Sequence, residues 1–261
     1  MNIFRFFIIS ILGFVISTPS SMIGLAGGFL FVPILILIFQ LPAQNAIAVS
    51  LFAITGTTVS ATLGYIRQKK VDFKLGLLYD ILDVPGVLLG AYLTTLLPSN
   101  ILTVICGIFL VMFSVLMMKK SISWNNKQLK KVHPKKFQYS IHTLISILTS
   151  SFLGGFMTGL VGLGGGITDT STMLLLGISP HIAVASSEFA MALTNIVGVI
   201  THGFLNNILL EYALPLTIGT IIGAQVGCLM CKRVKASFIR KVIVLITFVV
   251  GLRLIFSLFV V

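Results

Sequence analysis

The sequence predicts an all-α integral membrane protein made of two inverted-topology repeats of about five helical segments each. Hydrophobic residues make up 57% of its 261 residues and charged residues only 9%, a balance that water-soluble domains do not have. The apolar runs are long and lack the alternation of barrel strands, so we expect helices that cross the lipid bilayer. A glycine-rich stretch at 24–28 (GLAGG) recurs at 162–166 (GLGGG), which indicates a repeat.

Ten apolar segments follow one another, five on each side of a polar stretch. The first resembles the apolar core of a signal peptide, but no small-x-small cleavage site follows it, so we expect a retained helix. The segments fall at 3–22, 29–40, 46–66, 75–97, 101–118, 140–163, 167–178, 184–204, 208–230 and 238–260.

The polar stretch at 119–139 carries seven lysines, the only tryptophan and a proline. It has no apolar run long enough to fold alone, which is typical of a solvated linker. The chain is therefore expected to divide into a first membrane repeat (1–118), a basic cytoplasmic linker (119–139) and a second membrane repeat (140–261).

Lysine and arginine positions predict the topology. Nearly all of the 18 basic residues lie at 67–74, in the linker and at 231–241, and cytoplasmic loops collect such residues. Five crossings per half place all three basic regions on the cytoplasmic side of the plasma membrane and both termini outside. An odd number of crossings also turns the second half upside down relative to the first. The net charge of +12 is then an orientation signal, and we expect no nucleic-acid partner.

The repeat can be followed residue by residue. The small residues at 86–91 and at 219–224 form a small-xxx-small face that lets helices approach closely. Such a face can pack within one chain or between chains, so the oligomeric state stays open. Gly24, Leu25, Gly27 and Gly28 match Gly162, Leu163, Gly165 and Gly166; Ser50, Phe52 and Thr57 match Ser187, Phe189 and Thr194; Gly86, Gly90 and Ala91 match Gly219, Gly223 and Ala224.

The segments at 29–40 and 167–178 are too short to cross a membrane, so each is expected to begin inside it. The glycines before them would then line a cavity, because unpaired backbone at that depth must be buried in protein or hydrated. A helix N-terminus offers free N–H donors and a partial positive charge, and two such ends facing each other favour an anion. The alternative is that the glycines only allow close packing. The candidate substrate-binding residues are Gly24, Gly27, Gly28, Ser50, Thr57, Gly162, Gly164, Gly165, Gly166, Ser187 and Asn195.

These motifs resemble those of the sulfite exporter TauE/SafE family of membrane transporters over nearly the whole chain. The resemblance rests on GLAGGFLFVP from Gly24, GLGGGITDTS from Gly162, the AVxxS elements after them and the Gly-xxx-Gly-Ala motifs. It implies a secondary transporter in the plasma membrane for sulfite, sulfonates or related small anions.

The second half departs from the first by acquiring acids. Asp169 stands where the first half has Phe31, and Glu188 where it has Leu51. Glu188, Asn195 and His202 are spaced by sevens, so they follow one helix face with a drift of about 40°. An ionisable residue in a span indicates function, and this stripe is a candidate proton or cation route together with Asp169. The alternatives are that His202 is hydrated at the outer surface, that Glu188 is a hydrogen-bonded neutral acid and that Asp169 caps a helix.

Other polar residues suggest no chemistry of their own. Asp80 and Asp83 are expected to pair with Lys70 and Lys74 at the cytoplasmic surface. The CxxC at 228–231 merely stacks two thiols on one helix face. Motifs of known enzymes are missing, so no catalytic residue, metal ligand or cofactor is expected. The function predicted is secondary transport of a small anion by alternating access; the alternatives are a cation-coupled or cation-conducting protein and a non-transporting scaffold or sensor.

Overall fold

The computed structural model describes residues 3–123, 141–230 and 236–257, without the side chains of 119–123, 167 and 236–241. Ten helices and no strand occur in these ranges, which confirms the all-helical prediction. Helix α5 continues to Ser123, beyond the expected start of the linker, and the rest of that linker lies outside the described residues. The helices are α1 (Ile3–Ile23), α2 (Gly28–Leu37), α3 (Ala43–Arg67), α4 (Phe73–Leu96), α5 (Ser99–Ser123), α6 (Ile141–Val161), α7 (Gly166–Leu175), α8 (Pro180–Phe204), α9 (Leu210–Met230) and α10 (Ala236–Phe256).

Seven helices of the described chain are long and apolar enough to cross a membrane: α1, α3, α4, α5, α6, α8 and α9. Helices α2 and α7 have only 10 residues each. At 1.5 Å per residue this is roughly 15 Å, about half of the bilayer core. A short second helix in each half is therefore present, although it starts and stops earlier than the apolar runs suggest.

Each short helix follows a break in the backbone. Helix α1 ends at Ile23, and Gly24 then takes a φ of +74°; α6 ends at Val161, and Gly162 takes a φ of +69°. A residue in this left-handed region stops an α-helix, and glycine adopts it without a steric cost. The chain re-enters a helix a few residues later in both halves.

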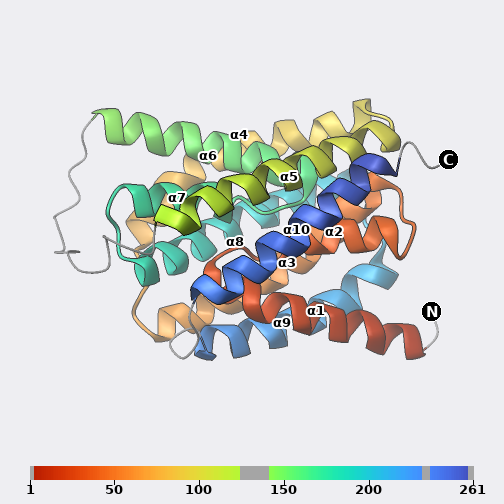
Figure 1. Cartoon of the computed structure of the whole chain (residues 1–261), viewed down its shortest axis with the longest axis horizontal. Coiled ribbons are helices and arrows are strands. Elements are labelled where there is room, and N and C mark those ends of the chain that lie inside the picture. The colour runs from red at the N-terminus through yellow and green to blue at the C-terminus, as the bar shows by residue number, and fades with distance from the viewer. Residues whose placement is uncertain (1–2, 124–140, 231–235, 258–261) are drawn as a thin grey trace.

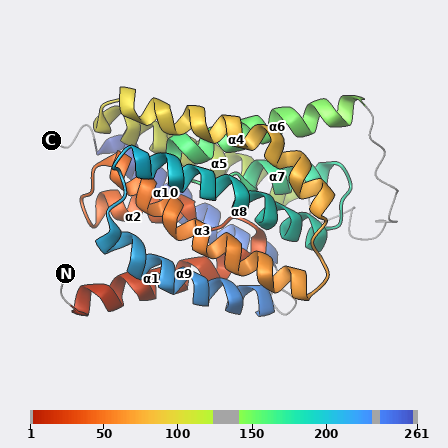
Figure 2. The ribbon, with the colours of Figure 1, turned by 180° about the vertical axis from the view of Figure 1, so that it is seen from behind.

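The two halves are interlocked (Figures 1 and 2). Helix α4 of the first half packs along α6 and α8 of the second, while α9 of the second half packs along α1 and α3 of the first. Helices α5 and α10 pack against each other. We call α4, α6, α7 and α8 the acidic bundle, because the buried acids Asp83, Asp169 and Glu188 all lie in it. Helices α1, α2, α3 and α9 form the neutral bundle.

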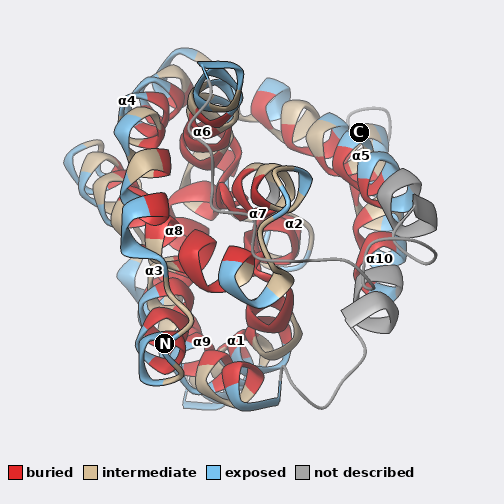
Figure 3. Ribbon diagram, turned by 90° about the vertical axis from the view of Figure 1, so that its left-hand side faces the viewer, coloured by how far each residue is buried: buried red, intermediate tan, exposed pale blue. Residues whose placement is uncertain are grey.

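Seen along the long axis of the molecule, α2 and α7 lie in the middle with long helices around them (Figure 3). Most of α2 is buried; Phe29 and Val32 are 0% exposed. Large apolar side chains cover the outer faces of the long helices instead, for example Leu63 on α3 and Leu229 on α9. Such a surface suits contact with lipid chains, whereas it would be a liability in water.

The packing of α4 and α9 corrects one expected match between the repeats. A Cβ on Gly86 would meet the carbonyl oxygen of Phe152, and one on Gly223 that of Phe14. Phe14 and Phe152 correspond when Gly24 is aligned with Gly162, so Gly86 corresponds to Gly223 and not to Gly219. The sequence misled because glycines at 219, 223 and 227 all have the spacing of one helical turn. In the corrected register Asp80 and Asp83 correspond to Thr217 and Thr220.

Candidate functional site at the paired glycine breaks

The two glycine breaks touch each other reciprocally. The Cα of Gly28, at the start of α2, faces the carbonyl oxygen of Gly162, so close that an added Cβ would overlap it. The Cα of Gly166, at the start of α7, faces the carbonyl oxygen of Gly24 in the same way. Because Gly28 matches Gly166 and Gly24 matches Gly162, these two contacts are the same contact made twice.

In this conformation the breaks are packed together, and one of the predicted binding residues holds them. The Ser50 hydroxyl donates to the Gly162 carbonyl oxygen at 3.1 Å, so these two predicted residues do meet. Thr57 bonds only to Ala53 one turn back on its own helix. Among the glycines of the two breaks, Gly164 has the loosest surroundings, since an added Cβ would find no neighbour closer than 3.5 Å.

No side chain caps the N-terminus of either short helix. Their N-cap residues are Gly27 and Gly165, and neither has a side-chain capping bond. The capping interpretation of Asp169 is wrong: its carboxylate accepts from the neighbouring Thr168 hydroxyl at 3.3 Å, and its Oδ2 has no partner. The first N–H groups of α2 and α7 therefore remain free of side-chain acceptors, as an anion site at these ends requires.

Helix α8 carries unsatisfied polar groups beside the second break. Ser187, Glu188 and Asn195 are 0% exposed, and the Ser187 hydroxyl, both Glu188 oxygens and both Asn195 amide atoms lack hydrogen-bond partners. Met191, on the same helix face between Glu188 and Asn195, touches Gly166. Glu188 is thus not the hydrogen-bonded acid of the alternative interpretation. Buried polar groups without partners are costly, so this face is a candidate ligand-binding surface.

His202 does not lie at a hydrated surface. It is fully buried, with Nε2 3.2 Å from the Gly159 carbonyl oxygen and Nδ1 3.2 Å from the Asn207 amide nitrogen. The interpretation of a simply hydrated histidine is wrong. Its bonds join α8 to α6 and to the following loop.

Asp80 and Asp83 are not part of surface ion pairs. Asp83 is fully buried, and the buried ammonium of Lys70 has no hydrogen-bond partner. Thr194 of α8 donates to Asp80 Oδ1 at 2.6 Å and lies 3.3 Å from Asp83 Oδ2. Asp83 and Asp169 are neighbours, since the Oδ1 atom of each lies 3.3 Å from the point that a Cβ on Gly154 would occupy. Sequence reasoning missed this cluster because α4 belongs to the first half but packs within the second.

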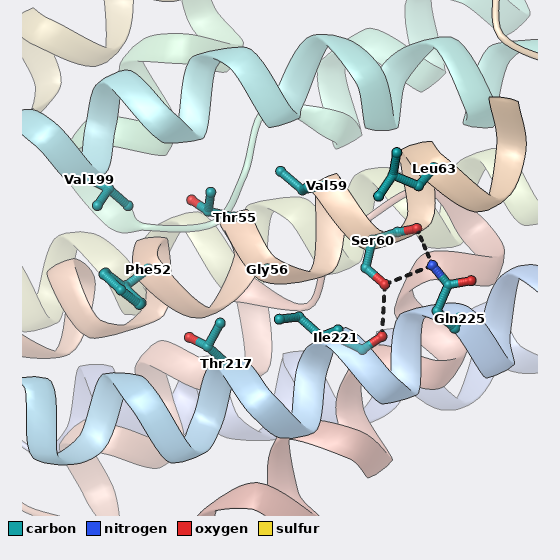
Figure 4. A pocket seen from close by; sticks show the side chains of 10 residues that line it. All are labelled: Phe52, Thr55, Gly56, Val59, Ser60, Leu63, Val199, Thr217, Ile221 and Gln225. Carbon is teal, nitrogen blue, oxygen red and sulfur yellow. Dashed lines mark hydrogen bonds between the residues drawn. The ribbon is translucent and has the colours of Figure 1, made fainter.

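A cavity of about 450 Å³ lies apart from the breaks, between α3, α9 and Val199 of α8 (Figure 4). The hydroxyls of Thr55, Ser60 and Thr217 all donate to backbone carbonyl oxygens, and the Gln225 amide donates to both the carbonyl oxygen and the hydroxyl of Ser60. Its polar side chains thus have no hydrogen left to offer an anion. The cavity is otherwise lined by apolar side chains, some of them exposed on the outer face.

Cys228 is buried, and the side-chain amide of Gln68 donates to its sulfur at 3.1 Å and to its carbonyl oxygen at 3.2 Å. Cys231, the other cysteine of the CxxC, lies outside the described residues.

Comparison with known proteins places this chain in a family. The family model of the sulfite exporter TauE/SafE matches residues 9–254. The chain is 34% identical to the probable membrane transporter protein YunE of Bacillus subtilis, over 97% of this chain and 98% of that protein. It is 26% identical to the probable membrane transporter protein MJ0441 of Methanocaldococcus jannaschii, over 93% and 92%. No solved structure matches. The chain belongs to the sulfite exporter TauE/SafE family of membrane transporters.

Proposed function

We propose that this protein is a secondary transporter of a small, sulfur-containing anion such as sulfite or a sulfonate, working by alternating access between two inverted repeats in the plasma membrane. The observation that carries the proposal is the reciprocal contact of Gly28 with Gly162 and of Gly166 with Gly24. Reciprocal contacts between two copies of one broken helix support a pseudo-two-fold axis between them. Substrate sites of many transporters lie at such an interface between repeats.

The inverted arrangement is supported by the number of helices per half, when each short helix is counted as one crossing. Five segments in each half reverse the direction of the second copy, and a two-fold axis in the membrane plane relates such copies. On this arrangement the basic loops are cytoplasmic and both termini lie outside.

The substrate would bind at the N-termini of α2 and α7, against the backbone of Gly24, Gly27 and Gly28 and of 162–166. The oxyanion would receive backbone N–H groups and the positive ends of two helix dipoles. Ser187 and Asn195 supply the side-chain donors, because their polar atoms are unused, whereas Ser50 holds the second break closed. The closed packing corresponds to a state without access from either side. Opening would separate the two breaks and release Ser50 to the substrate.

Coupling would use the two acids of the second half, Asp169 and Glu188, that stand where the first half has apolar residues. Glu188 is fully buried beside the break, and Asp169 lies in the first turn of α7. Both would repel an anion when ionised, so they would be protonated when the substrate binds and would move one or more protons with it.

Uptake into vesicles tests the proposal. Proteoliposomes containing the purified chain would be given labelled sulfite, a sulfonate, thiosulfate and chloride under an inward or an outward pH gradient. We expect accumulation of a sulfur oxyanion that depends on the gradient, with counterflow in its absence.

Variants then locate the site. Ser187→Ala and Asn195→Ala should weaken substrate binding, whereas Ser146→Ala, an exposed hydroxyl bonded within its own helix, should not. Absence of transport for every anion under both gradients would contradict the proposal. Stabilisation by cations alone would support the cation-coupled alternative instead.

A further inference from the structure

The acidic bundle contains a group of carboxyl side chains with no cation to neutralise them. Asp83 and Asp169 are 0% exposed, and Asp80 beside them is half-buried. Helices α6, α7 and α8 have no lysine or arginine, and the only one on α4, Lys74, is exposed at its start. The other titratable groups on the four helices are His142, His181, His202, Glu188, Tyr79 and Tyr92.

The two carboxyl groups come from different halves of the chain and meet over a glycine. Asp83 Oδ1 and Asp169 Oδ1 each lie 3.3 Å from the point that a Cβ on Gly154 would occupy. Gly154 belongs to α6, so the absence of a side chain there leaves the space in which α4 and α7 bring their carboxyl groups together.

The group has too few hydrogen-bond donors for three carboxylates. Thr194 has one hydroxyl hydrogen, which serves Asp80 at 2.6 Å and is 3.3 Å from Asp83, and Thr168 reaches Asp169 at 3.3 Å although it also donates to the Gly165 carbonyl oxygen at 2.7 Å. The Ser151 hydroxyl and the Gly155 N–H also lie beside Asp83, but the Ser151 hydroxyl donates to the Tyr79 carbonyl oxygen. Asp83 Oδ1 and Asp169 Oδ2 are buried and unpartnered. A buried carboxylate without a partner or a counter-ion is unfavourable, so some of these groups must hold protons or a cation.

A neutral polar group also lies near the pair. The hydroxyl of Tyr79 is buried and unpartnered, its residue is 0% exposed, and it is close enough to Asp169 and Asp83 to interact electrostatically with both. No set of three histidine, cysteine, aspartate or glutamate side chains in the described ranges has the geometry of a metal site. A proton therefore fits these groups better than a divalent ion.

We propose that Asp83 and Asp169 share a proton, and that loading and release of this proton decide whether α7 stays docked against α4. With one proton present, the acid O–H of one residue donates to the carboxylate oxygen of the other and joins the two helices. When the proton leaves to water, two like charges face each other in a site of low polarity and drive the helices apart. The second part of this inference rests on the proposed transport function, whereas proton sharing does not.

Infrared spectroscopy of the full chain in nanodiscs tests proton sharing without any substrate. The C=O stretch of protonated carboxylic acids would be followed through a pH titration in H2O and D2O, for the wild type and for Asp83→Asn, Asp169→Asn and the double variant. Asp72→Asn and Glu211→Gln are matched controls, because both acids are exposed at helix starts.

We expect the wild type to show a protonated-carboxyl component at neutral pH that depends on Asp83 and Asp169 and is lost in two separate steps, besides any component of Glu188, which all the variants keep. Each single variant should lose one step, and the last component should vanish at a pH lower by about one to three pH units, because the repelling partner is gone. The double variant should lack the component, and the controls should match the wild type.

Three outcomes would overturn the inference. The wild type could lack this band at neutral pH, the titration could be unchanged in both single variants, or added sodium could abolish the band by binding in place of the proton. If the single variants fail to fold, the double variant still tests the inference, because two amides can hydrogen-bond to each other without a shared proton. The titration of the wild type requires no variant at all. In vesicles, the variants should keep counterflow and lose the response to a pH gradient. A wild type that passes the infrared test but transports no anion would remove the transport proposal and leave the proton pair intact.

Discussion

The imidazole of His202 takes the place that the phenol of Tyr65 has in the other bundle. Tyr65 donates to the carbonyl oxygen of Ser21 at 3.0 Å, and His202 Nε2 lies 3.2 Å from that of Gly159. Ser21 and Gly159 correspond when the two breaks are aligned. A neutral histidine with its hydrogen on Nε2 satisfies this bond and also accepts from Asn207, so its position serves to tie two helices together.

His202→Tyr is therefore expected to be tolerated better than His202→Phe. Tyrosine keeps a donor for the Gly159 carbonyl oxygen, as in the other bundle. Phenylalanine leaves that acceptor and the Asn207 amide without partners, which should cost about 1–3 kcal/mol of stability. Thermal unfolding in detergent measures the difference. If His202→Tyr folds but transport no longer responds to a pH gradient, the histidine has a coupling role after all.

Alanine at Gly28 or Gly166 should prevent the breaks from closing. The added methyl group would overlap the backbone oxygen of Gly162 or Gly24, and backbone cannot rotate aside as a side chain can. We expect both variants to lower the unfolding temperature strongly. The control is Gly203→Ala, whose nearest neighbour would be Ile208 at 3.7 Å; it should be neutral or stabilising by up to about 1 kcal/mol. Equal effects at the three positions would argue against the contact.

Removing a hydroxyl should matter in only one bundle. Thr194→Val removes the donor that serves Asp80 and Asp83, and should destabilise the protein by about 1–3 kcal/mol. The matching Thr57→Val removes only a 3.3 Å bond within α3 and should cost less than about 1 kcal/mol. Thermal unfolding of both variants at one pH makes the comparison. Similar losses of stability would mean that the hydrogen bonds of Thr194 to Asp80 and Asp83 do not stabilise the protein.

Glu188 is expected to lower the stability of the protein and to be required for proton coupling. Leu51 fills the matching place in the first half, and the Glu188 oxygens have no partners, so Glu188→Leu should raise the unfolding temperature. Glu188→Gln should keep substrate binding and counterflow while removing the response of transport to a pH gradient, because an amide cannot release a proton. Accumulation by Glu188→Gln with unchanged pH dependence would make Glu188 a structural residue and leave coupling to Asp169 and its partners.

Gly154→Ala offers a test of the carboxyl pair that leaves every acid in place. Its methyl group would overlap the Thr168 hydroxyl, which can rotate, and would press on Asp83 and Asp169 at 3.3 Å. We expect the protein to fold, and the infrared band of the shared proton to shift or disappear. An unchanged band would show that the two carboxyl groups do not meet at Gly154.

The sequence predicted the helices and the duplicated breaks well, because both leave a local pattern. Apolar length gave the spans, and Gly24 and Gly162 interrupt them at matching places. The sequence also singles out Glu188 and Asn195, whose buried polar atoms have no hydrogen-bond partners; their role in a site stays a prediction.

Contacts between segments that are far apart in the chain could not be predicted from the sequence. Asp83 has a lysine nearby along the chain and looked like a surface residue, yet α4 carries it into the second half. The register of α9 was off by one turn because its glycines repeat every four residues, and only the backbone that faces them separates the possibilities. The spacing of His202 from Glu188 and Asn195 suggests a titrating group. Its bonds to Gly159 and Asn207 depend on how the helices pack, which the spacing does not show.

The exchange of α4 and α9 between the halves also dictates an order of assembly. Helix α1 is synthesised first, but Ser17 and Ser21 donate to carbonyl oxygens of Thr220 and Ala224, which are made nearly last. Helix α4 must likewise wait for α6 before Gly86 and Gly90 find the backbone that they pack against. The first half is therefore made while α1, α4 and α5 still lack the second-half helices that they pack against. Neither half can reach its final packing alone, and a chain cut within the linker should become stable only when both fragments are made together.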